Sequence, residues 1–324
     1  MDSPIKIGVS ACLLGHKVRF DGGHKRDAYV ADTLGAFFVF VPVCPEVECG
    51  LGVPRESLRL EGDPGAPRLV APKSGTDHTR RMLAFCAKRV EELANEDLCG
   101  FIFKSRSPTS GMERIKVYGE NGIPHMKGAG LFAKAFMDRF PLIPAEDEGR
   151  LHDVGLRENF IERIFTLARW RALEANLSGN VSGTRDDRTA LATFHARHKL
   201  LVMSHSPAIA REMGRLAANA EPASFADLRA AYLERLMRAL RLQATKAKHV
   251  NVLQHILGYF KKQLTSDEKA EMLDIIERYR RDEAPLLVPV TLLNHFVRKY
   301  GEPYLARQYY LAPHPWQLRL CNHA

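Results

Sequence analysis

Three cysteines stand at positions where thiol chemistry is easily assembled. Cys12 follows the apolar run 6–9, Cys44 follows the apolar run 36–41, and Cys49 comes after only four intervening residues. One loop can therefore offer two thiolates to a single metal centre. Three thiolates at one crevice suit an iron–sulfur cluster or zinc, and a three-ligand site leaves one position open for substrate. Reactive or buried thiols without a metal are the alternative interpretation.

The other three of the six cysteines carry less chemical information. Cys86 lies within a helical stripe and Cys99 lies beside an apolar run, so core packing is the expected role of both. Cys321 stands near the end of the chain without a motif around it. A closed site of four thiolates is therefore not indicated.

The elements that must position these cysteines form an alternating pattern. Apolar runs at 6–9, 36–41, 100–103 and 141–144 predict strands, and helical spacing over 77–95 and 130–139 predicts helices between them. This alternation predicts an α/β fold with an open, mostly parallel sheet and flanking helices. Sites on such sheets gather beyond the carboxyl ends of the strands, where Cys12, Cys44 and the segment 104–107 all fall.

The second half of the chain has a different pattern. Residues 145–152 are polar and predict a linker, and apolar stripes at helical spacing continue from about Leu156 onward. We therefore predict two domains, 1–146 and 152–324, of which the second is all-α with six to eight helices. No run of about 18 apolar residues is present, so no membrane contact is expected. The first residues lack a secretory signal, which predicts a cytoplasmic protein with reduced cysteines.

The net charge of +9 is distributed unevenly. Residues 1–150 contain 21 Lys+Arg and 20 Asp+Glu, whereas residues 151–324 contain 26 and 18. A basic domain beside a near-neutral one indicates that the second half binds a polyanion such as nucleic acid. A basic, solvated surface without a partner is the alternative.

Four motifs of the first half resemble the thiouracil desulfidase (TudS-like) family: Ser-Ala-Cys-Leu-Leu-Gly at 10–15, Val-Arg-Phe-Asp-Gly at 18–22, Val-Cys-Pro-Glu at 43–46 and Arg-Ser-Pro-Thr-Ser-Gly at 106–111. The helical half resembles the YbgA-like domain of unknown function. The two in this order resemble the RudS tRNA 4-thiouridine desulfidases over essentially the whole chain.

This resemblance implies a [4Fe-4S] cluster held by three cysteines, whose free iron takes the sulfur of a thiocarbonyl while water replaces it without net redox change. By position, Cys12 and Cys44 match two cluster ligands. Glu46 matches a catalytic carboxylate and Ser107 matches a catalytic serine.

One position departs from the family pattern. The family loop ends in Ser-Pro-Ser-Cys-Gly, and its cysteine is the third ligand, whereas this chain has Ser110 there. Our hypothesis is that Cys49 supplies the third thiolate. The rival hypothesis is that the ligand is lost at Ser110 and the cluster is weakened.

Several cations are candidates for contacts with substrate. Lys104 and Arg106 end a strand, where they can stabilise a developing anionic ring. Lys25 and Arg26 lie in a glycine-containing loop that can hold a phosphate or ribose or can be a plain surface turn. The expected tRNA contacts of the helical half include Arg197, Lys199, Lys261 and Lys262.

Two groups of rings in the second half allow two interpretations each. His195 and His198 are expected to contact RNA or to pack, rather than to bind a metal. Tyr309, Tyr310 and Trp316 can stack on bases, but core or interface packing is the favoured interpretation.

Together these features predict a cytoplasmic enzyme that removes sulfur from 4-thiouridine in tRNA by means of a [4Fe-4S] cluster. A desulfidase for free thiopyrimidines is the first alternative. A non-catalytic iron–sulfur sensor or RNA-binding protein is the second.

Overall fold

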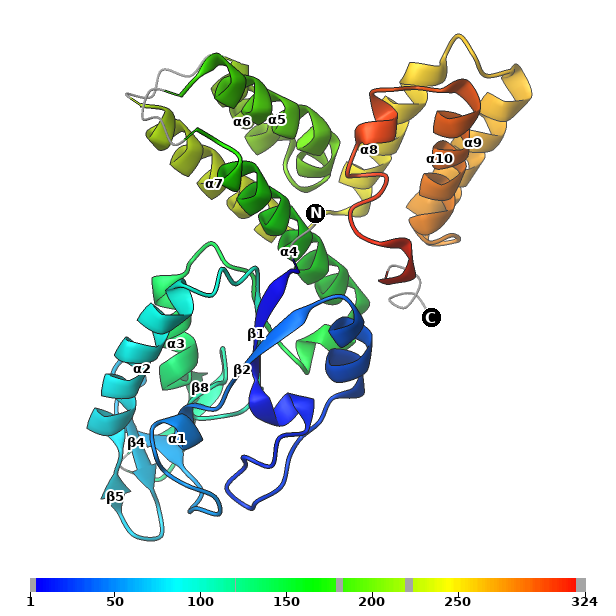
Figure 1. Ribbon diagram of the computed structural model, residues 1–324. Coiled ribbons are helices and arrows are strands. Elements are labelled where there is room, and N and C mark those ends of the chain that lie inside the picture. Colours follow the sequence, from blue (N-terminus) through cyan, green and yellow to red (C-terminus); the bar gives the residue numbers. More distant parts are fainter. Residues whose placement is uncertain (1–3, 120, 179–182, 219–223, 319–324) are drawn as a thin grey trace. The chain divides into compact units, whose positions relative to one another are not determined.

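The computed structural model describes residues 4–119, 121–178, 183–218 and 224–318 (Figure 1). Two compact units make up this part of the chain. One contains the described residues up to Ala168 together with Gln317 and Leu318, and the other is Arg169–Trp316. The division falls inside helix α4 (Val154–Ala175), so the predicted linker 145–152 belongs to the first unit.

A four-stranded parallel sheet forms the centre of the first unit. Its strand order is β2 (Val39–Val43), β1 (Lys6–Ser10), β6 (Phe101–Phe103) and β9 (Ala145–Asp147), which confirms the predicted parallel sheet. Gly8 of β1 lies opposite Phe101. A Cβ atom at Gly8 would lie 2.2 Å from the Phe101 ring, so only glycine permits this approach.

The last strand of this sheet lies at 145–147, and the prediction of a strand at 141–144 is wrong. Pro144 has no N–H group to donate to a neighbouring strand. Two of the three residues of β9 are acidic and buried, and Glu146 is satisfied by the Arg150 side chain. Because the segment is polar, its hydropathy predicts a linker rather than a strand.

A second, five-stranded sheet was not predicted from the sequence. Its order is β5 (Thr76–Asp77), β4 (Arg68–Ala71), β3 (Arg59–Glu61), β7 (Ile115–Tyr118) and β8 (Pro124–Gly128). The pairing is antiparallel except between β3 and β7. These strands have two to five residues each and carry many charged side chains, so no apolar run marks them.

Helices cover both faces of the parallel sheet. On one face, Phe101 and Phe103 pack with α2 (Thr79–Ala94) and α3 (Leu131–Arg139), which lie together in Figure 1. On the other face, Ile7 and Val9 pack with Phe160 and Ile164 of α4. Cys86 and Cys99 are buried in these two cores, as predicted. Short turns complete the unit: η1 (Ala11–Leu14), η2 (Tyr29–Thr33), η3 (Leu34–Ala36), α1 (Pro45–Glu48) and η4 (Arg150–His152).

The described part of the second unit is all-helical, which confirms the prediction. After the end of α4 it contains α5 (Arg185–His205), α6 (Pro207–Ala218), α7 (Phe225–Arg241), α8 (Lys246–Leu257), η5 (Gly258–Phe260), α9 (Ser266–Arg280), α10 (Leu287–Tyr300) and η6 (Leu305–Arg307). Capping boxes at Thr184 and Thr265 begin α5 and α9. Trp170 stacks on Tyr232 in the core. Across the described ranges, we find no helix with the length and apolarity needed to span a membrane.

Candidate active site

Three chain segments meet at the carboxyl ends of β1, β2 and β6. They surround a cavity of about 530 Å³, here called the site pocket. The pocket lies where ligands bind in open parallel sheets. It confirms the expected meeting of the three segments, and its lining includes Ser10, Cys12, Arg19, Lys25, Cys44, Glu46, Arg55, Lys104, Arg106, Ser107 and Ser110.

Helix α1 aims Glu46 into this pocket. Cys44 precedes the helix in an extended conformation, and Pro45 occupies the first helical position, where the missing N–H group costs nothing. The Cys44 N–H donates to Glu48 Oε1 at 2.7 Å, which fixes the turn. The side chain of Glu46 is 14% exposed, and its Oε2 lies 3.5 Å from Cys44 Sγ.

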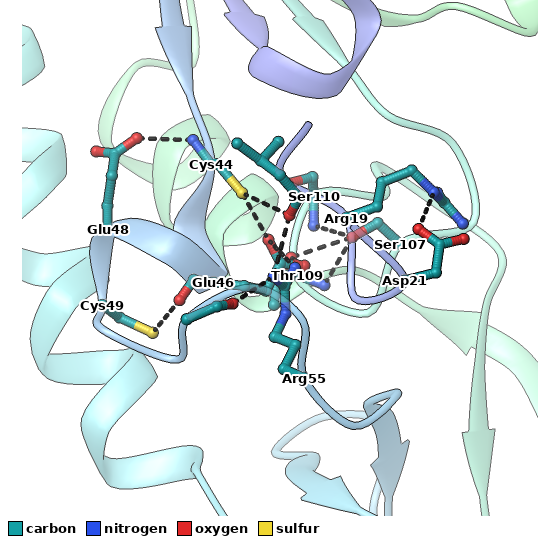
Figure 2. Close-up of polar contacts among 12 residues, drawn as sticks. Arg19, Asp21, Cys44, Glu46, Glu48, Cys49, Arg55, Ser107, Thr109 and Ser110 are labelled. Carbon is teal, nitrogen blue, oxygen red and sulfur yellow. Dashed lines mark hydrogen bonds and ion pairs between the residues drawn. The ribbon is translucent and has the colours of Figure 1, made fainter. Parts of the chain in front are cut away.

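A chain of hydrogen bonds links Glu46 to the loop after β6 (Figure 2). Thr109 Oγ1 donates to Glu46 Oε1 at 2.7 Å and lies 3.0 Å from Ser107 Oγ. Ser107 Oγ also accepts from the backbone N–H of Ser110 at 3.0 Å. Thr109 is fully buried. The two predicted catalytic residues, Glu46 and Ser107, are therefore joined through Thr109.

The loop 107–111 is held in place by the start of α3. The Thr109 carbonyl accepts from the backbone N–H groups of Phe132 and Ala133, at 2.9 and 3.1 Å. These donors would otherwise be unsatisfied at a helix N-terminus. A Cβ atom at Gly130 would lie 2.5 Å from the Thr109 carbonyl, so the close approach requires glycine. The fold thus fixes Thr109 before any ligand binds.

The pocket thiols are protonated in the absence of a metal. Burial raises the pKa of Cys12 to about 11, and Lys104 opposes this shift. Burial, reinforced by the nearby Glu46 carboxylate, raises the pKa of Cys44 to about 12. A metal group would have to displace a proton from each thiol.

Cys49 does not share the pocket with these two thiols. It ends α1 on the side opposite Cys44, and its sulfur donates to the Glu46 carbonyl at 3.3 Å (Figure 2). Its side chain packs against the core that contains Cys86. Ser110 lines the pocket instead. The third position beside Cys12 and Cys44 therefore holds a hydroxyl, and the role of Cys49 as a ligand stays a prediction.

The cationic side chains of the site pocket differ in the ion pairs and hydrogen bonds that they make. Lys104 Nζ pairs with Glu148. Burial tends to raise the pKa of the Glu148 carboxyl, but the hydrogen bonds from Lys104 and Ser105 outweigh burial and hold this pKa below its ordinary value. Arg55 donates to the carbonyls of Val18 and Gly52 at 3.0 Å each. Lys104 and Arg106 both line the site pocket, Lys104 in an ion pair with Glu148 and Arg106 exposed, and their contact with a substrate ring stays a prediction.

The remaining predicted contacts lie outside the pocket, apart from Lys25. Arg26 pairs with Asp32. The predicted tRNA contacts of the helical unit are exposed: Arg197, Lys199, Lys261 and Lys262.

Two of the five rings considered for RNA contact, His198 and Tyr310, lie in the core of the helical unit. His198 is 1% exposed and stacks on Phe194, and Tyr309 lies 4.4 Å from its ring. Tyr310 is buried as well, and only Trp316 is exposed.

Two residues that contact Glu46 were not identified from the sequence. Arg55 lies in a loop after Cys49 and reaches within 3.9 Å of Glu46 only through the fold. Thr109 belongs to the quoted loop motif, yet a threonine between proline and serine gives no signal of a contact with a carboxylate 63 residues away.

No group of three or more His, Cys, Asp or Glu side chains in the described ranges is arranged to hold a metal ion. The groups that line the site pocket include the Cys12 and Cys44 thiols, the Glu46 carboxylate and the Ser110 hydroxyl. Thiolate sulfur is the usual ligand of iron–sulfur clusters. The chemistry of the two thiols that line the site pocket, with the Ser110 hydroxyl beside them in the lining, fits such a group.

Comparison with known proteins divides the chain in the same way. Residues 7–148 match the 2-thiouracil desulfurase family model, and residues 199–315 match a family of unknown function, DUF1722. The uncharacterized protein YbgA of Escherichia coli (strain K12) is 32% identical over 134 residues, which are 41% of this chain and 79% of that protein. A solved structure of TudS, a [4Fe-4S]-dependent thiouracil desulfidase, is 29% identical and covers 46% of this chain and 93% of its own, with a TM-score of 0.38.

The desulfurase match spans every residue of the site pocket named above, from Ser10 to Ser110. It indicates an enzyme that removes sulfur from thiopyrimidines. The chain belongs to the YbgA-like family, and in it a TudS-like domain of the 2-thiouracil desulfurase family precedes the YbgA-like region.

Proposed function

We propose that this protein removes sulfur from 4-thiouridine in tRNA with a [4Fe-4S] cluster bound in the site pocket. The observation that carries the proposal is that Cys12, Cys44 and Glu46 share one cavity within the region that matches the desulfurase family. Cys12 and Cys44 would hold the cluster through sulfur, and Ser110 would face it with its hydroxyl.

When bound, the cluster supplies a Lewis-acidic iron for the thiocarbonyl sulfur. Glu46 accepts a proton from the attacking water through Oε2, because Oε1 accepts from Thr109, and Oε2 loses the contact with the Cys44 S–H group once that thiol is deprotonated as a ligand. The water oxygen forms a bond to the ring carbon, the carbon–sulfur bond breaks, and sulfur leaves as hydrogen sulfide. No electrons are gained or lost, so the chain needs no redox partner for this step.

The choice of tRNA over a free base is supported by the charge of the second half of the chain. Residues 151–324 contain 26 basic and 18 acidic residues, and a free thiobase has no phosphates for such a surface to bind. Exposed cations include Arg197, Lys199, Lys261 and Lys262. Neutralising several phosphates makes binding strongly dependent on salt.

The test is anaerobic incubation of the reconstituted protein with tRNA that contains 4-thiouridine and, separately, with free 4-thiouracil. We expect the near-ultraviolet absorbance of the thiocarbonyl to disappear faster from tRNA. The matched control is Glu46→Gln, which should lower kcat by about 10²- to 10⁴-fold while its iron content stays the same. A preference for the free base would support the first alternative, and no loss from either substrate would overturn the proposal.

A further inference from the structure

A second cavity adjoins the site pocket in the same unit. Its volume is about 460 Å³, and its walls come from β3, β7, β8 and the loop that follows β6. The two cavities share three lining residues: Leu58, Arg106 and Pro108. A ligand that occupies the site pocket can therefore extend into this second cavity, here called the side cavity.

The side cavity is strongly cationic. Arg59, Arg106, Arg114 and Lys116 line it, and among the described residues no carboxylate belongs to its lining. Arg59 is paired with Glu61 at 2.7 Å. The other three cations are exposed and make no ion pair with any described residue. A concave surface with three uncompensated cations attracts an anion.

The backbone holds two of these arginines in an unusual conformation. Arg106 has a φ of 58° and Arg114 a φ of 54°, both in the left-handed region. This region is unfavourable for a residue with a Cβ atom. Such conformations persist where the surrounding fold enforces them, and they cluster at ligand sites. The two arginines lie at either end of the loop that carries Ser107 and Thr109.

A flat ring and apolar side chains complete the side cavity. The Arg59 guanidinium lies 4.8 Å from the centre of the Tyr118 ring, which is half-buried. Leu58 and Met126 also line the cavity, and Met126 is 53% exposed. Cations beside an accessible aromatic ring are the combination with which proteins bind the phosphates and bases of single-stranded nucleic acids.

We propose that the side cavity binds the nucleotide next to the thiolated one in an RNA strand, which rests on the function proposed above. Arg106, Arg114 and Lys116 bind the phosphodiester group that joins the two nucleotides, and Tyr118 stacks on the neighbouring base. The first unit then recognises the polynucleotide backbone by itself, in addition to any contact made by the helical unit.

The test uses the full, reconstituted chain and a fluorescently labelled triuridylate without sulfur, so that binding is measured independently of the reaction. We expect Arg114→Gln/Lys116→Gln to raise the Kd about tenfold and to flatten the dependence of log Kd on log salt by about 1 to 2. The matched control is Lys73→Gln/Arg80→Gln, which removes the same charge from exposed positions of the same unit outside both cavities. Equal Kd values for the two double variants would overturn the proposal.

Two single variants test the stacking part. Tyr118→Phe should keep the Kd of the wild type, and Tyr118→Leu should raise it about fivefold or more. Equal affinities of the Tyr118→Phe and Tyr118→Leu variants would show that the ring does not stack on a base. Failure of the wild type to desulfidate any thiolated substrate would overturn the proposed function alone, because binding of triuridylate is read separately.

Discussion

The two units of this chain bury polar side chains in opposite ways. In the first unit, Cys12, Glu46 and Ser107 come from segments far apart in the sequence and line one cavity, and the buried Thr109 holds Glu46 from behind. In the helical unit, two histidines each make one hydrogen bond within the unit: His198 Nδ1 lies 2.8 Å from the Phe194 carbonyl, and His195 Nδ1 lies 3.1 Å from the Tyr232 hydroxyl. The Nε2 atom of His198 is buried and has no hydrogen-bond partner among the described residues.

The net charge of the two halves of the chain does not indicate where the cation-lined cavities lie. Residues 1–150 are nearly neutral and residues 151–324 carry almost the whole excess of +9. Yet both cavities, with their clusters of Arg and Lys, lie in the near-neutral unit. Net charge measures the balance of a segment, whereas anion binding depends on where the cations lie and on whether a carboxylate already pairs with them.

The largest effect should come from removing a pocket thiol. We expect Cys44→Ser to lower bound iron and sulfide at least about tenfold. Mutation of a residue that only hydrogen-bonds to a metal ligand already lowers metal affinity by about that much. The matched control is Cys49→Ser at the other end of α1, which should keep the iron because its sulfur lies outside the site pocket. Iron analysis of both reconstituted variants is the measurement. An equal loss in Cys49→Ser would instead show that Cys49 supplies the third thiolate.

The sequence was sufficient to predict which residues line one cavity wherever local pattern and covalent tethering determine position. Apolar runs in the sequence predict the strands β1 and β6. Glu46 lies two residues from Cys44, so the chain itself keeps the two side chains close. The position of Cys49 could not be predicted, because spacing along the chain does not say to which side of a single helical turn a side chain points.

Contacts between residues far apart in the chain could not be predicted from the sequence either. Thr109 meets Glu46 because the loop after β6 is anchored on α3, and Arg55 approaches Glu46 because its side chain is held by the carbonyls of Val18 and Gly52. The second sheet was missed because its strands are short and charged, so that pairing between strands, rather than hydropathy, defines them. The side cavity depends on that sheet and was missed with it.

Acid should weaken the helical unit. Burial lowers the pKa of His198 to about 3 and that of His195 to about 4, whereas an unfolded histidine titrates near 6.5. The unfolded chain therefore binds more protons as the pH falls below about 6.5. Stability is fully present above that pH and decreases towards the folded pKa values. At pH 5 the loss from His198 is about 2 kcal/mol.

Tryptophan fluorescence measures this loss in the helical unit alone, because the two tryptophans of the chain, Trp170 and Trp316, both belong to it. Thermal unfolding should move to lower temperature between pH 7 and pH 5. His198→Gln should reduce that shift, since glutamine does not titrate. A shift of the same size in His198→Gln would show that other groups govern the acid sensitivity.

A smaller effect is expected from Thr109, which orients the Glu46 carboxylate without lining the site pocket itself. Thr109→Val keeps the shape of the buried side chain but removes the hydrogen bond to Glu46 Oε1. The carboxylate then loses the group that orients it, and we expect kcat to fall about tenfold, the equivalent of one hydrogen bond of about 1.4 kcal/mol, with little change in KM. Thr109→Ser retains the hydroxyl and should restore most of the rate. Equal rates in the Val and Ser variants would mean that packing against α3, and not the hydroxyl, is what the pocket requires at this position.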